Sequence, residues 1–289
     1  MRVVQISDVH LSRKHGFFVE NWWNTVRHVN ALSPDLVVIT GDLAINGPDE
    51  DDELAFARSE LARLAPPWRA IAGNHDVGDE PPGQDAKQLI DMPRLARWRR
   101  TIGADHWAET IGRWRLIGLN AQLYGSGLDA ETEQQSWLEE QLTGDGFDGI
   151  GVFLHKPLFI EGMGDPASAA CVTPVPRERL LSTFAAAPVR FVASGHLHCH
   201  TILTHSGIDL IWAPSTAFLA GSADGTAQDH VVPNTRRELG ILVYELGDEG
   251  YQMRFEAVPG IEPLYLSDLK QGKYAFLRDM PPYMPAGRF

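Results

Sequence analysis

Short apolar runs rich in β-branched residues recur along the chain, and segments with helical periodicity separate them through the first two thirds. Such runs predict strands, because β-branched side chains pack well on a pleated surface. The predicted strands are residues 2–7, 36–40, 68–72, 114–119, 150–154, 189–194, 208–213, 240–246 and 251–258. The predicted helices are residues 19–32, 50–65, 91–102, 132–142 and 176–187. This order predicts an α/β fold with a largely parallel portion and added antiparallel strands.

The domain organisation follows from the same pattern, in which no linker separates two apolar cores. We predict one domain over residues 1–260 and a C-terminal extension over residues 261–289, where periodicity is weak. The extension is expected to pack on the domain or on a second subunit, which leaves a homo-oligomer open. Residues 161–176 are rich in Gly, Pro and Ala and predict a long loop, and long loops in compact domains are often functional.

The composition is that of an ordinary globular protein, with 44% hydrophobic and 22% charged residues. No apolar run approaches the ~20 residues that span a bilayer, so we expect no membrane partner. The first residues enter a predicted strand directly, which leaves no room for a cleavable leader. Two cysteines, Cys171 and Cys199, are too few for a disulfide framework and suit a reducing compartment. We therefore expect a cytoplasmic protein.

The formal net charge is -13, from 25 Lys and Arg against 38 Asp and Glu. A polyanion would meet a repulsive surface unless one face were locally basic, so the charge disfavours a nucleic acid polymer as partner. The Arg cluster at residues 94–100 predicts a solvated helix face. The acidic run at residues 48–53 predicts the first turn of a helix, where carboxylates interact well with the helix dipole, rather than a metal site.

Five of the predicted strands each run into a side chain that can bind a metal ion. These side chains are Asp8 and His10, Asp42, Asn74 with His75 and Asp76, His155, and His196 with His198. Taken singly, each is explained by a turn, a cap or an ordinary buried hydrogen bond. Ligands bind at the carboxyl ends of strands in open α/β sheets, so the five sets are expected to converge on one rim. Their joint occurrence in this context favours a metal site.

The donor types indicate the kind of ion. Carboxylate, imidazole and one amide oxygen, without thiolate, suit Mn, Fe, Zn or Co. The seven candidate ligands are Asp8, His10, Asp42, Asn74, His155, His196 and His198. Seven exceed the need of one ion, whereas two divalent or trivalent ions that share Asp42 use them all. Cys199 lies among the histidines, but a small buried side chain is the favoured interpretation of a free cysteine.

The sequence resembles the calcineurin-like metallophosphoesterases, and within them the bacterial cyclic-nucleotide and glycerophosphodiester phosphodiesterases. The matching motifs, in family order, are DVH at 8–10, GD at 41–42, GNHD at 73–76, the histidine of LHKP at 154–157 and GHLH at 195–198. The resemblance implies an α/β fold built as a four-layer αββα sandwich of two mixed β-sheets flanked by helices. It also implies that Asp8, His10 and His198 hold one ion, that Asn74, His155 and His196 hold the other, and that Asp42 bridges them.

Three histidines at alternate positions, His196, His198 and His200, would share one face of a continuous strand. Gly195 predicts a turn instead, which lets His196 and His198 address different ions. His200 is then left over, and we expect it to support the site or the fold, because coordinating groups need hydrogen-bonded neighbours.

The resemblance implies hydrolysis of a phosphoric ester by a hydroxide that bridges two metal ions. The ions and Asn74 would neutralise the phosphoryl oxygens in the transition state. His75 is the predicted catalytic residue that protonates the leaving oxygen or stabilises the transition state, and Asp76 is predicted to orient it. A loop carboxylate with no such role is the alternative for Asp76.

A small phosphodiester, of cyclic nucleotide or glycerophosphodiester type, is the preferred substrate. The predicted walls of the site are residues 11–24, 77–90, 122–128 and 161–176. The first of these stretches contains His15, Phe17, Phe18, Trp22 and Trp23, which either stack a nucleobase or pack into the core. A phosphomonoesterase or protein phosphatase and a DNA repair nuclease are the enzymatic alternatives. A non-catalytic scaffold is less favoured, because function is argued from the site and every site residue is present.

Overall fold

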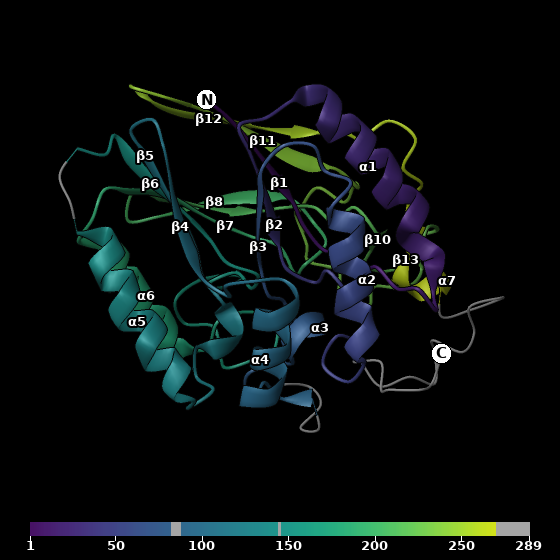
Figure 1. Cartoon of the computed structure of the whole chain (residues 1–289), viewed down its shortest axis with the longest axis horizontal. Helices are drawn as coiled ribbons and strands as arrows, with labels where there is room; N and C mark the ends of the chain where they lie inside the picture. The colour runs from purple at the N-terminus through teal and green to yellow at the C-terminus, as the bar shows by residue number, and fades with distance from the viewer. Residues whose placement is uncertain (82–87, 144–145, 270–289) are drawn as a thin grey trace.

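The computed structural model describes residues 1–81, 88–143 and 146–269. Two large β-sheets pack against each other, and helices flank both of them (Figure 1). The predicted stretch 77–90 is described only in part, because residues 82–87 lie outside the described residues.

The first sheet has the strand order β12-β11-β1-β2-β3. Its strands are β1 (Arg2–Ile6), β2 (Leu36–Thr40), β3 (Trp68–Ile71), β11 (Ile241–Gly247) and β12 (Gly250–Glu256). The strands β1, β2 and β3 are parallel, whereas β11 and β12 join antiparallel to β1 and to each other. The sheet is therefore mixed, and helices α1 (Val19–Leu32) and α2 (Asp51–Leu61) make the connections between its parallel strands.

The second sheet has the strand order β4-β5-β6-β7-β9-β8. Its strands are β4 (Trp107–Ile111), β5 (Trp114–Gly118), β6 (Gly149–Phe153), β7 (Val189–Ser194), β8 (Thr201–His205) and β9 (Ile208–Trp212). The four central strands are parallel, and β4 and β8 pair antiparallel at the two edges. Helices α5 (Asp129–Leu142) and α6 (Pro174–Ala185) lie together along this side of the molecule (Figure 1).

Three apolar layers hold the sheets and helices together. Val4 and Ile6 of β1 pack with residues of α1, α2 and α4 (Met92–Thr101). Val3 of the same strand faces the second sheet, because successive side chains of a strand point to opposite faces. A third layer lies between the second sheet and helices α5 and α6. The predicted four-layer arrangement of helix, sheet, sheet and helix with two mixed sheets is confirmed.

All nine predicted strands and all five predicted helices are present, with shifted ends. The largest shifts are at α2, which ends at Leu61 rather than 65, and at α5, which begins at Asp129 rather than 132. The unpredicted elements are β4, β8, β10 (Phe218–Leu219), β13 (Leu264–Tyr265), α3 (Asn74–Val77), α7 (Leu266–Leu269), and the 3-10 helices η1 (Gly16–Phe18) and η3 (Ala121–Leu123). Strands β4 and β8 are edge strands with half-exposed sequences, so no apolar run marks them.

The described part of the extension packs on the domain. Strand β13 pairs in parallel with β10, and α7 follows it directly. Residues 270–289 lie outside the described residues, and the boundary at residue 260 stays a prediction. Across residues 1–81, 88–143 and 146–269, none of the helices has the length and apolar character needed to cross a membrane.

Candidate dimetal site

The ends of strands β1, β2, β3, β6 and β7 bring the predicted ligands together. Within the described residues, three groups have ligand atoms that all lie within 4.8 Å of one another. The groups are Asp8, His10 and His198; Asp42, His155 and His196; and His10, Asp42 and His75. Residues 190 positions apart in sequence therefore meet at one rim, as the pattern of strand ends predicts.

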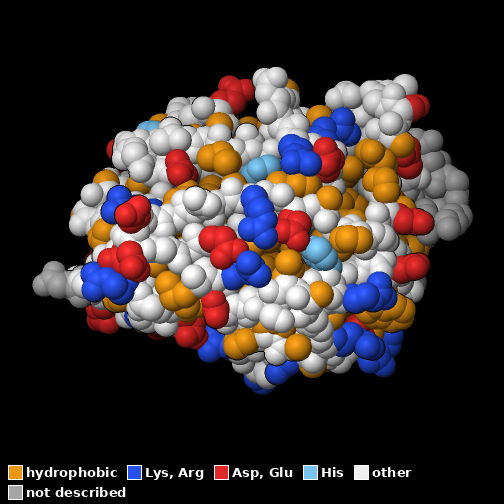
Figure 2. Space-filling view, turned by 90° about the horizontal axis from the view of Figure 1, so that it is seen from above, with side chains coloured by type: hydrophobic (Ala, Val, Ile, Leu, Met, Phe, Trp, Pro, Cys, Tyr) orange, Lys and Arg blue, Asp and Glu red, His pale blue; other side chains and the backbone are white. Residues whose placement is uncertain are grey.

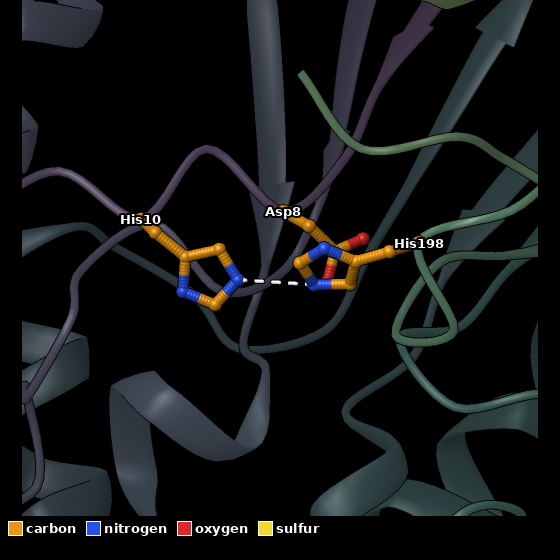
Figure 3. A group of neighbouring side chains, drawn as sticks. All are labelled: Asp8, His10 and His198. Carbon is orange, nitrogen blue, oxygen red and sulfur yellow. Dashed lines mark hydrogen bonds and ion pairs between the residues drawn. The ribbon is translucent and has the colours of Figure 1, made fainter. Parts of the chain in front are cut away.

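The first cluster joins Asp8, His10 and His198 (Figure 3). The His10 and His198 rings point toward each other, with their Nε2 atoms 3.2 Å apart, and Asp8 Oδ1 lies 3.4 Å from His198 Nε2. The other ring nitrogen of His198, Nδ1, donates to the Phe218 carbonyl at 2.8 Å. Because a carbonyl only accepts, the proton is on Nδ1, and Nε2 of the neutral ring points a lone pair into the cluster.

The second cluster joins His155, His196, Asn74 and Asp42. His155 Nε2 lies 3.0 Å from Asn74 Oδ1, 3.2 Å from His196 Nδ1 and 3.4 Å from Asp42 Oδ1. Both rings donate outward to backbone carbonyls, His155 Nδ1 to Thr40 at 2.8 Å and His196 Nε2 to Ala169 at 3.1 Å. When both rings are neutral, their two inward nitrogens converge with one oxygen of Asp42 and one of Asn74 as electron-pair donors.

Asp42 lies between the two clusters. Its Oδ1 is 3.4 Å from His155 Nε2, and its Oδ2 is 3.8 Å from His10 Nε2. The backbone N–H of His75 donates to Oδ1 at 2.9 Å and holds the carboxylate in this position. One carboxylate thus presents an oxygen to each cluster, which is the arrangement of a shared ligand.

The charges of the metal-free site fit a cation. Burial raises the pKa of Asp8, but His198 and His155 lower it to about 2. Burial lowers the pKa of His155, but Asp42 and Asp8 raise it to about 9. Without a metal ion, the His155 ring therefore holds an extra proton among the electron-pair donors of the second cluster. Burial and the neighbouring His155 lower the pKa of His196 to about 3, which keeps its ring neutral. A metal ion would replace the proton and satisfy the same donors. The donor set therefore fits one cation in each cluster.

The backbone is held in an uncommon conformation at five of these residues. Asp8, His10, Asp42, His196 and His198 have φ between 44° and 69°, in the left-handed region that non-glycine residues rarely adopt. Such conformations concentrate at functional sites, where the surrounding structure maintains them. Strand β7 ends before His196, so His196 and His198 do not share a strand face, and they enter different clusters as the turn at Gly195 predicts.

His75 lies beside the first cluster, with its ring perpendicular to that of His10 and 4.9 Å from it. Its Nδ1 donates to the Ile45 carbonyl at 2.8 Å. The carboxylate of Asp76 accepts instead from the backbone N–H groups of Gly73, Leu43 and Ala44, at 2.9, 2.9 and 3.0 Å. Asp76 was predicted to orient the His75 ring, but the Ile45 carbonyl makes that contact. Asp76 instead links the start of α3 to the loop after β2 through hydrogen bonds.

A buried charged cluster beside the site carries no sequence signal. The Lys156 side chain is fully buried and donates to Asp79 and, at 2.8 Å, to Glu80. With its amide placed to satisfy both neighbours, Gln122 donates to Glu80 at 2.7 Å and accepts from the Asn74 backbone N–H at 3.2 Å. This network supports the chain on either side of Asn74 and His155. A lysine after a predicted strand is usually exposed, so sequence reasoning passes over it.

The remaining candidates lie outside the three groups of ligand atoms. His200 donates from Nδ1 to the Trp212 carbonyl at 2.8 Å, which is a supporting contact within the second sheet. Burial raises the pKa of the Cys199 thiol to about 11, so it is neutral. Trp22 is in the core and Trp23 is 47% exposed. The aromatic residues near the first cluster are Phe18 and the unpredicted Phe218, whose rings lie 6.4 and 5.0 Å from that of His10.

Two facing mixed sheets with paired Asp and His clusters at their strand ends define an α/β metallophosphoesterase with a site of dimetal type. The sequence model described as calcineurin-like phosphoesterase matches residues 1–200, and the chain belongs to this family.

Curated relatives include both phosphatases and diesterases. The chain is 28% identical over 199 residues to the serine/threonine-protein phosphatase CPPED1 of Bos taurus, covering 64% of this chain and 61% of that protein. It is 31% identical over 169 residues to a probable glycerophosphodiester phosphodiesterase, GpdQ, of Arcobacter nitrofigilis, covering 54% and 57%. It is 31% identical over 165 residues to a probable cyclic nucleotide phosphodiesterase of Moraxella catarrhalis, again covering 54% and 57%. The chain thus spans less than two thirds of these relatives.

Solved structures show the same fold. A dimetal phosphatase of Danio rerio aligns with a TM-score of 0.57 at 15% identity, over 89% of this chain and 96% of that one. The purple acid phosphatase PPD1 of yellow lupin aligns with a TM-score of 0.61 at 14% identity, over 94% and 55%. At these identities the likeness extends to the fold alone.

Proposed function

We propose that the protein is a phosphodiesterase that hydrolyses small phosphodiesters, of cyclic nucleotide or glycerophosphodiester type, with two metal ions. The observation that carries the proposal is the pair of electron-donor clusters joined by Asp42. The names of the Arcobacter and Moraxella relatives support the choice of a diester.

The ligands divide between the two ions. Asp8, His10 and His198 would hold one, Asn74, His155 and His196 would hold the other, and Asp42 would serve both. Bound ions of the Mn, Fe, Zn or Co type would supply positive charge for the phosphoryl oxygens and lower the pKa of solvent enough to make a nucleophile at neutral pH.

The chain's own residues complete the site. Asn74 presents its amide beside the second cluster, where it can also orient a phosphoryl oxygen. His75 is only partly buried and stands next to His10, which places its ring where it can donate a proton to the leaving oxygen. The Ile45 carbonyl fixes the ring by accepting from Nδ1, which leaves Nε2 as the nitrogen that faces a substrate.

A substrate panel on Mn-loaded protein tests the proposal. It contains bis-para-nitrophenyl phosphate, para-nitrophenyl phosphate, 3′,5′-cAMP and glycerophosphodiesters, with metal analysis of the same samples. We expect two metal ions per chain and a higher kcat/KM for at least one diester class than for the monoester. A monoester preference across the panel would contradict the proposal.

A protein phosphatase is the second candidate, favoured by the match to CPPED1. A phosphoserine peptide in the same panel separates the two, because a diesterase leaves it largely intact. A nucleic acid polymer is disfavoured by the net charge of -13 and by the interspersed basic and acidic side chains on the face shown in Figure 2. Short duplex DNA at low salt is the corresponding control.

A further inference from the structure

The long loop between β6 and α6 reaches the second cluster through one backbone group. This loop covers residues 154–173. The carbonyl of Ala169, a residue that is 8% exposed, accepts from His196 Nε2 at 3.1 Å. Because a carbonyl cannot donate, the contact puts the ring proton on Nε2 and leaves Nδ1 as the nitrogen that faces His155. The conformation of the loop therefore decides which nitrogen of His196 is available to an ion.

Arg177 of α6 holds the loop from its inner side. The side chain is fully buried, and it also contacts the Cys171 sulfur at 3.9 Å. Its guanidinium donates to three carbonyls of the loop, those of Leu158 at 3.4 Å, Met163 at 3.0 Å and Asp165 at 2.6 Å. These contacts lie on both sides of Ala169 along the chain. A guanidinium carries its donors in a rigid planar fork, so this one side chain fixes several points of the loop at once.

The charge of Arg177 is costly where it lies. Among the described residues, the acceptors that the guanidinium reaches are all neutral, three carbonyls and a thiol. A buried charge without a charged partner is less favourable than an apolar side chain of similar size. The benefit of the guanidinium therefore lies in the loop that it organises.

Asp165 fixes the same loop within itself. Its carboxylate accepts from the N–H groups of residues 160, 161 and 162, at 2.7, 3.0 and 3.1 Å. The Val172 N–H donates to the Pro157 carbonyl at 2.9 Å and closes the base of the loop. The position of the Ala169 carbonyl thus depends on contacts that converge on Arg177 and Asp165.

We propose that Arg177 is a positioning residue for the second cluster and acts through the Ala169 carbonyl on the metal ligand His196. The inference rests on the proposed division of ligands between two ions and does not depend on the substrate. Groups that orient metal-ligating histidines in this way typically contribute 10- to 100-fold to metal affinity. His198 of the first cluster is oriented by the Phe218 carbonyl instead, so the ion of that cluster should be unaffected.

Metal titration tests the proposal. Mn²⁺ is titrated calorimetrically into metal-free wild-type, Arg177→Met and His196→Ala protein, and two binding steps are expected in the wild type. In Arg177→Met the affinity of one step is expected to fall roughly 10- to 100-fold, and it should be the step that His196→Ala abolishes. Arg177→Lys keeps the charge without the planar fork and should recover only part of the affinity. Two unchanged steps in folded Arg177→Met would overturn the proposal. An equal fall in both steps would also overturn it, because a general loosening of the fold weakens both.

The matched control is Arg179→Met. Arg179 lies two residues further along α6, is exposed and pairs with Glu131 at 3.1 Å. Both of its binding steps are expected to equal those of the wild type. Asp165→Ala is a milder second variant, because Asp165 is only partly buried, and it should weaken the same step as Arg177→Met by a smaller factor. If Arg177→Met does not fold, an unchanged step in Asp165→Ala would overturn the proposal.

Nitrogen NMR of the histidine rings separates this result from failure of the proposed dimetal function, because it uses metal-free protein. The wild-type His196 ring is expected to carry its proton on Nε2. In Arg177→Met the proton should be shared between Nε2 and Nδ1, whereas Arg179→Met should match the wild type. This change supports the positioning of His196 by Arg177 even where the wild type binds fewer than two ions. A His196 ring that keeps its proton on Nε2 in Arg177→Met would overturn the proposal.

Discussion

The backbone N–H of His196 donates to both carboxylate oxygens of Asp8, at 3.2 and 3.0 Å, although the two residues belong to different metal clusters. The loop after β7 therefore holds a ligand of the first cluster while it supplies a ligand of the second. After β3, the backbone N–H of His75 likewise holds a metal ligand, since it donates to Asp42. Backbone donors of this kind orient ligands without occupying the space that an ion needs.

Gly195→Ala tests this connection. A methyl group at residue 195 would overlap the Ser7 hydroxyl and approach Asp8 Oδ2 to 2.6 Å, so the Asp8 carboxylate must move. We expect metal affinity to fall about 10- to 100-fold, the usual effect of disturbing groups that orient ligands. Metal titration of the apoprotein measures this. Gly247→Ala is the control, because a methyl group there makes only ordinary contacts. Equal affinities of the two variants would contradict the argument.

Asp42→Ala removes the one side chain that both clusters share. We expect less than half the metal content of the wild type and an activity at least ~10²-fold lower, because the site loses the negative charge that lies between the two clusters. Metal ions at 100 times their Kd stabilise a folded protein by about 2.7 kcal/mol. Chelation should therefore lower the Tm of the wild-type protein more than that of Asp42→Ala. Asp248→Asn, at an exposed turn, should behave as the wild type. Full metal content in Asp42→Ala would show that Asp42 is not a shared ligand.

His75→Ala separates proton donation from metal binding. We expect two bound metal ions and a loss of kcat of about 10²- to 10⁴-fold on esters with alkoxide leaving groups, the range of general acid catalysis. The loss should be much smaller with para-nitrophenolate, which leaves without a proton. Kinetics on both ester types, with metal analysis, measure this, and His230→Ala in an exposed loop is the control. An equal loss on good and poor leaving groups would remove His75 as the proton donor.

Asp105 gives a pH dependence away from the metal site. Its carboxylate is buried, which raises its pKa, but His106 and the Arg99 guanidinium, whose Nε donates at 2.7 Å, lower the pKa to about 2. A depressed pKa in the folded state adds stability above the unfolded value near 3.8, and this stability is lost as the pH falls toward 2. Asp105→Asn should cost roughly 2 kcal/mol at pH 7 and progressively less between pH 4 and pH 2. Urea denaturation across this range measures it.

Arg99→Met is the companion variant for that series, because it removes the donor and keeps the carboxylate. Arg99→Met alone should reproduce part of the pH dependence. In the double variant with Asp105→Asn, the loss in free energy of unfolding should be less than the sum of the two single losses. A destabilisation by Asp105→Asn that is constant from pH 7 to pH 2 would show that the carboxylate charge contributes nothing.

The sequence was sufficient for the parallel strands and for the side chains at their ends, because buried strands leave apolar runs and chemistry-bearing residues follow them directly. The sequence was insufficient where a side chain has a backbone group as its hydrogen-bond partner, or a partner far away along the chain. The carbonyls of Thr40, Ala169 and Phe218 select the histidine tautomers, yet a carbonyl is common to every residue. Strand β8 was missed because an edge strand needs no buried run. Lys156 was missed because its two partners lie more than seventy positions away.

Lys156→Met tests whether that buried cluster supports the fold around the site. The substitution removes the ammonium group that pairs with both Asp79 and Glu80, and it leaves these two buried acidic side chains next to each other. Breaking a buried ion pair by removing one partner costs about 3–5 kcal/mol, because the remaining charge is uncompensated. We expect a loss of this size in the urea unfolding of the metal-free protein. Lys14→Met is the matched control, since Lys14 pairs with Glu50 at the surface, where ion pairs contribute little. If both lysine variants unfold alike, the cluster does not stabilise the fold.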